Sequence, residues 1–402
     1  MRVSIAIAIF ILLASTSCQS QKQNNKPDPA LSAQFKQNLN DASAQYKILA
    51  KNLPPGKFPK TFFPKTGQYE FSNSGWWCSG FYPATLLYLY EQTKDKSLYD
   101  EAMRVMDTLK KEQFNKNTHD LGFMMYCPFG NANRIAPKPE YKEILLNSAK
   151  SLSTRFNPLV GSIRSWESKP EDFIVIIDNM MNLDLLFWAT KASGDSSFYK
   201  IAVTHANTTI KNHFRPDNSS YHVLNYDPQT GAIKQKRTAQ GAADESAWAR
   251  GNAWGLYGFT VTYRETKDPN YLDQANKIAQ FLLSHPNLPA DKIPYWDFNA
   301  PDIPNALRDA SAASVMASAL LELSKYVDAE KSKQYFKAAE IILQSLSTST
   351  YKAAPGTNGG FILQHGVGHL PGGTEIDVPL TYGDYYYVEA MMRYLSWRRS
   401  SY

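Results

Sequence analysis

The chain has 402 residues, an aromatic content of 13% and a formal net charge of +6, and these values exclude several classes of protein. The length fits two average domains or one large closed domain. The positive charge is mild and lacks a basic block, which argues against nucleic-acid binding and fits an anionic ligand only weakly. Beyond the leader only Cys78 and Cys127 remain, too few for a disulfide framework and without metal-site spacing, so both are expected to be packed thiols.

The beginning of the chain is typical of a bacterial secretory signal. Arg2 precedes an apolar run over residues 3–14, and small residues follow up to Cys18. Residues 1–17 are predicted to be a lipoprotein signal peptide, because the apolar run is too short for a comfortable membrane span. Cys18 is predicted to be the lipidated first residue of a periplasmic or outer-membrane-anchored lipoprotein, with ordinary cleavage nearby as the alternative.

A polar segment separates this signal from the folded part of the chain. Residues 18–30 are rich in Gln, Ser, Lys, Asn and Pro, and this composition predicts a disordered tether. Residues 31–402 are predicted to form one domain.

Helical periodicity recurs throughout that domain, while strand signals are scarce. Asp95, Asp195 and Asp268 each follow the end of one predicted helix and open the next, and an aromatic residue follows one turn later. Aspartate is a preferred N-cap, so the recurring junction predicts helical hairpins. The predicted helices cover residues 32–53, 80–93, 97–114, 141–153, 172–193, 196–214, 246–266, 270–284, 311–325, 332–347 and 385–398.

Long segments rich in Gly, Pro, Trp and Asn separate the hairpins. Long loops in a compact domain are usually functional. If the hairpins form a ring, these loops gather at one end and build a pocket. The sequence therefore predicts an all-α fold, a single α/α toroid, with pocket-forming loops over residues 54–77, 118–139, 156–171, 217–245, 287–308 and 353–383.

One predicted helix, over residues 172–193, combines apolar faces with polar residues in its middle. A helix that is hydrophobic all round is buried, yet this one contains Asp178, Asn179, Asn182 and Asp184. Burying a carboxylate is unfavourable and raises its pKa, which is what a general acid working near neutral pH requires. Asp178 is therefore a candidate acid. The alternative is that these residues form hydrogen bonds within the core.

The loops carry further candidates. Asp120, preceded by His119, supplies a second carboxylate, and two carboxylates are what glycoside chemistry uses, although helix capping is the commoner role of an aspartate. Trp248 and Trp254 flank Arg250. Indole rings stack on sugars and the guanidinium pairs with carboxylates, with core packing as the alternative.

The glycine-rich stretch from His365 to His369 disfavours a helical pair of metal ligands. No metal site is predicted.

Taken together, five segments resemble the unsaturated glucuronyl hydrolases, family 88 of the glycoside hydrolases. They occur in the order found in that family and span nearly the whole mature chain. The segments are Trp77-Cys-Ser-Gly-Phe81, His119-Asp-Leu-Gly-Phe123, Ile177-Asp-Asn-Met-Met-Asn182, Trp248-Ala-Arg-Gly-Asn-Ala-Trp254 and Leu380-Thr-Tyr-Gly-Asp-Tyr-Tyr-Tyr387.

The resemblance implies an (α/α)6 barrel and assigns roles to individual residues. Asp178 takes the place of the general acid/base and Asp120 that of the second essential carboxylate. The implied substrate-binding residues are Trp77, His119, Trp166, His222, Gln240, Trp248, Arg250 and Trp254. Cys78 stands where the family commonly has a hydroxyl or carboxylate side chain. The loop over residues 364–377 is too variable to align.

The reaction implied is removal of the terminal 4,5-unsaturated uronic acid from lyase-generated glycosaminoglycan oligosaccharides. Protonation at C4 and addition of water at C5 need no cofactor. The alternatives are an unsaturated rhamnogalacturonyl hydrolase, a non-catalytic glycan-binding lipoprotein and, ranked last, a polysaccharide lyase of the same fold. The sequence leaves the parent polysaccharide and the oligomeric state open.

Overall fold

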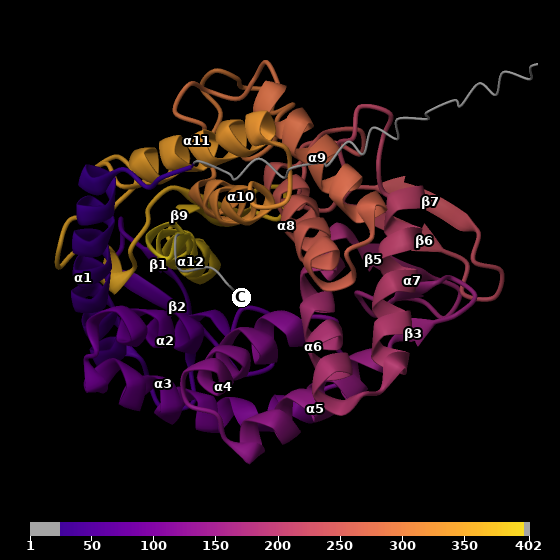
Figure 1. Cartoon of the computed structure of the whole chain (residues 1–402), viewed down its shortest axis with the longest axis horizontal. Helices are drawn as coiled ribbons and strands as arrows, with labels where there is room; N and C mark the ends of the chain where they lie inside the picture. Colours follow the sequence, from indigo (N-terminus) through magenta and orange to yellow (C-terminus); the bar gives the residue numbers. More distant parts are fainter. Residues whose placement is uncertain (1–24, 398–402) are drawn as a thin grey trace, which may run out of the picture.

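The helical hairpins close into a ring of two concentric layers (Figure 1). The computed structural model describes residues 25–397. The inner layer consists of α2 (Phe81–Thr93), α4 (Asn131–Ile135) with the preceding η2 (Gly122–Gly130), α6 (Leu183–Ser193), α8 (Ala249–Thr266), α10 (Ala310–Leu323) and α12 (Thr381–Leu395). The outer layer consists of α1 (Pro29–Asn52), α3 (Lys96–Leu109) with η1 (Lys110–Phe114), α5 (Pro139–Ser153), α7 (Ser196–Asn212), α9 (Pro269–Ser284) and α11 (Ala329–Leu346).

Burial separates the two layers. Every residue of α10 is buried, as expected for an inner helix, whereas the outer α3 buries only one face. Together the layers form the predicted (α/α)6 barrel, whose core lies between them and extends into the centre of the ring, where Trp254 meets Phe123 and Tyr386.

The predicted hairpin junctions are confirmed. Asp95 accepts a hydrogen bond from the Ser97 amide at the start of α3, and Asp195 and Asp268 do the same for α7 and α9. The aromatic residue one turn later packs against the preceding inner helix, as in Tyr99 against Tyr90 with ring centroids 5.0 Å apart. These short inner-to-outer connections therefore follow from local sequence rules.

The N-terminal predictions are tested only in part. The signal peptide and Cys18 lie outside the described residues. Residues 25–30, predicted to belong to a disordered tether, instead contact the barrel: the Asp28 amide donates to the Tyr394 hydroxyl at 2.7 Å and Asp28 caps α1. None of the helices within residues 25–397 is long and apolar enough to cross a bilayer.

The predicted helix over residues 172–193 is wrong in its first half. Residues Phe173–Ile176 form strand β5, and the 3₁₀ helix η3 (Ile177–Asn182) then leads into α6. β5 pairs with β6 (Val223–Tyr226), which also pairs with β7 (Ile233–Arg237). An apolar run this short is compatible with strand or helix, and pairing with a segment about fifty residues away decided it.

A second prediction missed an inner helical segment. Residues 122–130, predicted to be loop, form the π-helix η2. Its two glycines and Pro128 are loop signals. Gly122 is required here because a Cβ at this position would lie 2.6 Å from the Asn182 Cα.

The remaining strands form small antiparallel hairpins in the long connections. Each such connection runs from an outer helix to the next inner helix, so all of them gather where the inner helices begin. The pocket-forming loops are thus at one end of the ring, as predicted. The hairpins are β1 (Phe58–Phe63) with β2 (Gln68–Ser72), β3 (Phe156–Asn157) with β4 (Ser162–Ile163), and β8 (Gly366–His369) with β9 (Thr374–Val378).

Candidate active site

The sheet β5–β6–β7 brings three predicted site residues together. Ile176 pairs with Val223, and Val223 with Arg237. Asp178 therefore lies just beyond the end of β5, His222 just before β6, and Gln240 just after β7. Residues far apart in the sequence meet because the register places the three strand ends side by side.

Asp178 is a carboxylic acid whose side chain is largely buried. Its side chain is 14% exposed, and its Oδ2 has no hydrogen-bond partner among the described residues. Burial raises the pKa of Asp178 to about 7; the nearby Arg250 opposes this rise and the charge of Asp120 adds to it. Near neutral pH, a large fraction of Asp178 therefore carries a proton.

His222 directs an N–H group toward Asp178. Its Nδ1 accepts hydrogen bonds from the amides of Ala239 at 3.2 Å and Gln240 at 3.1 Å, so in the neutral ring the proton is on Nε2. Nε2 lies 3.8 Å from Asp178 Oδ2. Burial, with Arg250 second, holds the pKa of His222 well below its usual range, so the ring is neutral.

Three buried polar atoms around this point lack partners within the described chain: Asp178 Oδ2, His222 Nε2 and Trp254 Nε1. Buried polar groups are almost always hydrogen-bonded. The indole N–H of Trp254 lies close enough to Asp178 to lower the pKa of that acid, and an acid oxygen beside two N–H donors with no other partner is suited to a polar ligand.

Asp384 is a second buried carboxyl, and its hydrogen bonds show that it has a structural role. Burial also raises the pKa of Asp384 to about 7. Unlike Asp178, Asp384 accepts hydrogen bonds from the amides of Ile362 and Leu363 at 2.9 and 2.8 Å. The pKa alone therefore does not distinguish the two aspartates, whereas the unpaired oxygen does.

Asp120 lies near Asp178 and beside His119. His119 Nε2 is 3.4 Å from Asp120 Oδ2, and the side chain of Asp120 is 13% exposed. Asn179 fixes the imidazole: its amide donates to the Ile163 carbonyl at 2.7 Å, so its Oδ1 accepts from His119 Nδ1 at 2.9 Å. Burial lowers the pKa of His119. His119 Nε2 is therefore an acceptor beside Asp120.

Arg250 and Gln240 already have partners in the structure. Arg250 is 1% exposed and forms an ion pair with the buried Asp309 at 2.9 Å. Arg250 and Gln240 also donate to the same carbonyl, that of Gly368, at 2.6 and 2.9 Å. The sequence predicted both as ligand contacts, and the structure places them at the site with only part of their donors available.

The predicted aromatic residues surround these groups to different extents. Trp248 packs against His222 in a tilted arrangement with centroids 4.4 Å apart, and Trp166 meets His222 edge to face at 5.8 Å. Trp77 is half-buried, with Tyr382 4.8 Å away. Trp254 is fully buried, so it presents its Nε1 rather than an open ring face to the site.

Several site residues were missed or underrated by sequence reasoning. Asn179 was noted only as a polar residue in an apolar run, and Tyr382 only as part of a matching segment. Asp309 carried a weak signal, as a possible N-cap before a predicted helix. Glu375 on β9 carried none; burial raises its pKa, and it lies close enough to Arg250 for that charge to lower the pKa in turn.

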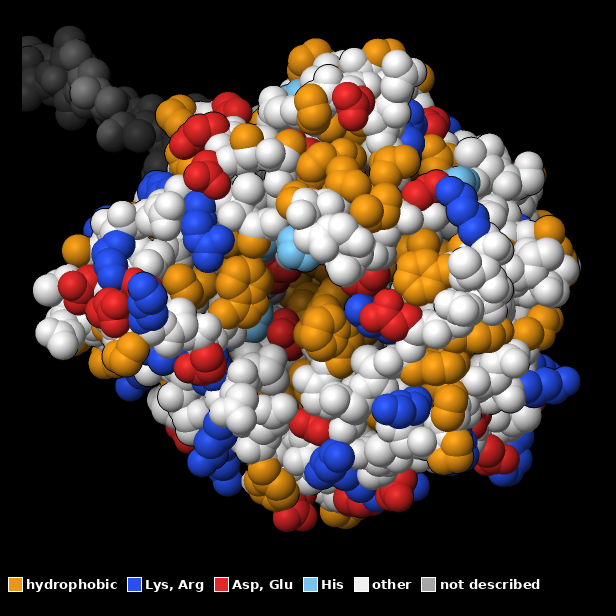
Figure 2. Space-filling model, turned by 180° about the vertical axis from the view of Figure 1, so that it is seen from behind, with side chains coloured by type: hydrophobic (Ala, Val, Ile, Leu, Met, Phe, Trp, Pro, Cys, Tyr) orange, Lys and Arg blue, Asp and Glu red, His pale blue; other side chains and the backbone are white. Residues whose placement is uncertain are grey.

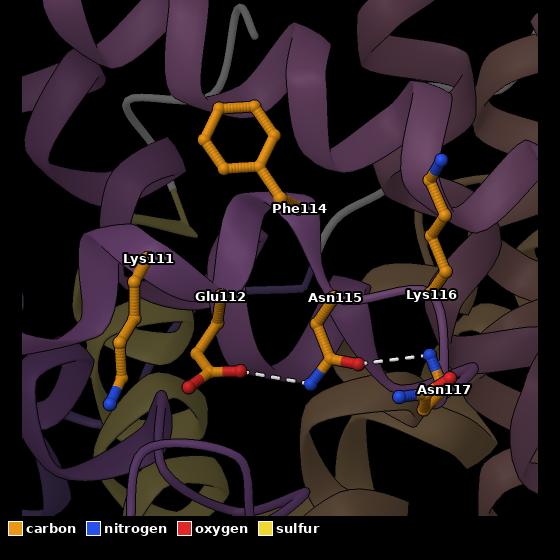
Figure 3. Close-up of a pocket in the computed structure, with 6 residues that line it drawn as sticks. All are labelled: Lys111, Glu112, Phe114, Asn115, Lys116 and Asn117. Carbon is orange, nitrogen blue, oxygen red and sulfur yellow. Dashed lines mark hydrogen bonds between the residues drawn. The ribbon is translucent and has the colours of Figure 1, made fainter.

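The molecular surface agrees with this location. The face seen in Figure 2 is hollowed near its centre, where hydrophobic, acidic and histidine side chains meet. A separate open depression beside η1 contains none of the site residues (Figure 3). It is lined by Lys111, Glu112, Phe114, Asn115, Lys116 and Asn117. Among the described residues, no three His, Cys, Asp or Glu side chains gather as metal ligands would.

Comparison with known proteins agrees with the geometry. The family model described as Glycosyl Hydrolase Family 88 matches residues 56–293. The chain belongs to this family.

Family 88 relatives match the chain over most of its length. An unsaturated glucuronyl hydrolase of Formosa agariphila is 42% identical over 397 residues, which is 97% of each chain. An unsaturated chondroitin disaccharide hydrolase of Streptococcus pyogenes is 32% identical over 82% of this chain and 84% of its own. A crystal structure of an unsaturated glucuronyl hydrolase specific for heparin has a TM-score of 0.88 and 47% identity, covering 92% of this chain and 98% of that one.

Proposed function

We propose that this family 88 protein is an unsaturated glucuronyl hydrolase that removes the terminal 4,5-unsaturated uronic acid from glycosaminoglycan oligosaccharides. The observation that carries the proposal is Asp178, a carboxyl with a pKa of about 7 whose Oδ2 has no hydrogen-bond partner among the described residues. The family and its relatives support the same reaction and favour neither a rhamnogalacturonyl hydrolase nor a binding protein.

The first step is protonation of the substrate double bond. The C4=C5 bond of the substrate is an enol ether conjugated with a carboxylate, and it becomes reactive when C4 accepts a proton. Asp178 donates that proton, since a large fraction of it is protonated near neutral pH. Positive charge then develops at C5 and the ring oxygen, where the carboxylate of Asp120 stabilises it.

The second step is addition of water at C5. Asp178, now a carboxylate, accepts a proton from the attacking water, and the N–H groups of His222 and Trp254 orient the groups around it. The hydrated product is a hemiketal that opens and releases the attached sugar. Each proton that leaves Asp178 is thus returned by water, and no other reactant is consumed.

The substrate carboxylate binds at the cationic wall of the pocket. Arg250 is the cation with the largest electrostatic effect on Asp178, because its charge lowers the pKa of that acid more than any other group does. Gln240 donates a hydrogen bond to the same backbone carbonyl as Arg250, that of Gly368. Both offer N–H donors to an anionic group.

We further propose that heparin-type disaccharides are preferred over chondroitin disaccharides. Sequence identity is 47% to the heparin-specific structure and 32% to the chondroitin enzyme. The protein is also proposed to be a lipoprotein, attached through Cys18 to the outer membrane or facing the periplasm, as the leader sequence indicates.

Loss of ultraviolet absorbance tests the reaction, because the absorbance reports the C4=C5 double bond. The substrates are unsaturated disaccharides from heparin, chondroitin and hyaluronan, with an unsaturated rhamnogalacturonan disaccharide as the rival substrate. Absorbance is expected to fall on glycosaminoglycan disaccharides, fastest on the heparin-type one. A correctly folded protein that is active only on the rhamnogalacturonan fragment, or on none, would contradict the proposal.

A further inference from the structure

The β8–β9 hairpin, residues 366–378, is held in place by the residues expected to bind the substrate. Arg250 Nη1 donates to the Val367 carbonyl at 2.5 Å, and Nη2 donates to the Gly368 carbonyl at 2.6 Å. Gln240 Nε2 donates to the Gly368 carbonyl as well, at 2.9 Å. The position of the hairpin and the binding of an anionic ligand therefore depend on the same two side chains.

Asp309 determines how Arg250 is oriented. Asp309 is fully buried, and its Oδ2 accepts from Arg250 Nη1 at 2.9 Å. The guanidinium carbon lies over the rings of Trp248 and Tyr382, 4.6 and 5.3 Å from their centroids. With Nη1 donating to Asp309 and Val367 and Nη2 donating to Gly368, the remaining donors of Arg250 are Nε and the second Nη2 hydrogen, which form one edge of the guanidinium.

The same carboxylate also joins three elements. Asp309 Oδ1 caps α10 by accepting from the Ser311 amide at 3.0 Å and the Ser311 hydroxyl at 2.6 Å. The Val367 amide of β8 approaches the same oxygen at 3.4 Å. One buried anion thus connects α8, α10 and the hairpin, which is more than an N-cap requires.

We propose that Asp309 is a positioning residue for this enzyme. It holds Arg250 so that Nη1 retains the β8–β9 hairpin as a wall of the pocket while the Nε/Nη2 edge faces the substrate carboxylate. This inference rests on the proposed function for its substrate. It concerns binding of the substrate and not proton transfer, since Asp309 itself does not reach the reacting atoms.

The variant Asp309→Asn tests the proposal, because it retains an oxygen that can cap α10 but removes the charge paired with Arg250. KM for the preferred unsaturated disaccharide is expected to rise at least tenfold, while kcat changes less than threefold. Asp268→Asn, at the N-cap of α9, is the matched control and is expected to leave KM unchanged. If Asp309→Asn unfolds, Asp309→Ser replaces it, because serine is also a preferred N-cap.

Hydrogen exchange of the hairpin provides a readout that needs no substrate. Amides of residues 366–378 are expected to exchange faster in Asp309→Asn than in the wild type, and at the wild-type rate in Asp268→Asn. Unchanged KM together with unchanged hairpin exchange would overturn the proposal, and so would a loss in kcat alone. If the wild type acts on no unsaturated disaccharide, the proposed function fails, while the exchange rates still decide whether Asp309 positions the hairpin.

Discussion

At the scale of single residues, the site is defined by which buried polar atoms lack partners. Asp178 and Asp384 are both buried aspartates with a pKa of about 7. Of the two, only Asp178 has a buried oxygen without a hydrogen-bond partner among the described residues. The comparison shows why a raised pKa identifies a candidate acid only when the geometry leaves its oxygen free for a ligand.

Substitution of these two aspartates is expected to separate chemistry from stability. Asp178→Asn removes the proton donor, so kcat/KM is expected to fall by about 100-fold to 10,000-fold. Asp384→Asn leaves one side-chain oxygen where two backbone amides need acceptors. The variant should therefore have a lower melting temperature, while kcat/KM changes little. The check is kcat/KM and a thermal melt on both variants. A larger activity loss in Asp384→Asn than in Asp178→Asn would contradict the assignment.

At the scale of elements, close packing between α8 and η3 fixes the position of Asp178. A Cβ at Gly258 of α8 would lie 2.5 Å from the Met180 Cβ and 3.0 Å from its backbone. A Cβ at Gly255, one turn earlier, would meet Ile177 at an ordinary 3.6 Å. The same helix therefore provides both a position that tolerates alanine and one that does not.

The glycine pair yields a prediction for this packing. Gly258→Ala is expected to displace η3, destabilise the protein by about 1–3 kcal/mol and lower kcat. Gly255→Ala should be neutral or slightly stabilising, because alanine favours a helix by up to about 1 kcal/mol over glycine. Urea unfolding and kcat on the two variants provide the measurement. Equal effects of both substitutions would show that the contact with Met180 does not matter.

The elements predicted correctly from sequence are those governed by local rules. The N-caps at Asp95, Asp195 and Asp268 depend on a few neighbouring residues, and they gave the hairpins and hence the ring. Strand β5 was missed because its partner β6 is distant in sequence. The π-helix η2 was missed because glycine is normally a loop signal. Here Gly122 is required instead by close packing against Asn182, a contact that the local sequence does not reveal.

The same distinction applies to the site. Residue type and neighbouring motifs pointed to Asp178, Asp120 and Arg250, and the resemblance to family 88 added His222. Nothing in the sequence showed that Arg250 pairs with Asp309, or that Gln240 shares the Gly368 carbonyl with it, because those contacts span 59 to 128 residues.

At the scale of the whole molecule, the two ends of the ring have different roles. The end where the inner helices begin holds the site. Near the C-terminal ends of α8, α10 and α12 lies a structural charge network, in which Arg264 pairs with Asp184 at 2.8 Å and with Glu322 at 3.0 Å, and Arg393 pairs with Glu322 at 2.7 Å. Asp184, noted in the sequence beside Asp178, thus connects α6 to α8 and has a structural role.

Buried histidines outside the pocket make the whole fold sensitive to acid. Burial lowers the pKa of His205 and of His213 to about 3. Their stabilising contribution is present above the unfolded-state pKa of about 6.5 and is lost progressively as the pH falls toward 3. At pH 5, about 1.5 units below the unfolded-state pKa, each histidine is expected to lower the free energy of unfolding by about 2 kcal/mol.

Urea unfolding at pH 7.5 and pH 5 measures this effect. The double variant His205→Gln, His213→Gln is the control, because buried acids such as Asp384 act in the opposite direction in both proteins and cancel in the difference. Between pH 7.5 and pH 5, the free energy of unfolding of the wild type is expected to fall by about 4 kcal/mol more than that of the variant. A difference that does not depend on pH would show that these imidazoles are already charged or accessible in the folded protein.

The pH dependence of kcat/KM tests the central claim most directly, namely that protonated Asp178 starts the reaction. The value kcat/KM reports the ionisation of the free enzyme, and the pKa of Asp178 is about 7. With a non-titrating unsaturated disaccharide, kcat/KM is expected to be constant below about pH 6.5 and to fall tenfold per pH unit above about pH 7.5. A kcat/KM that stays constant from pH 6 to pH 9, or rises with pH, would contradict Asp178 as the proton donor.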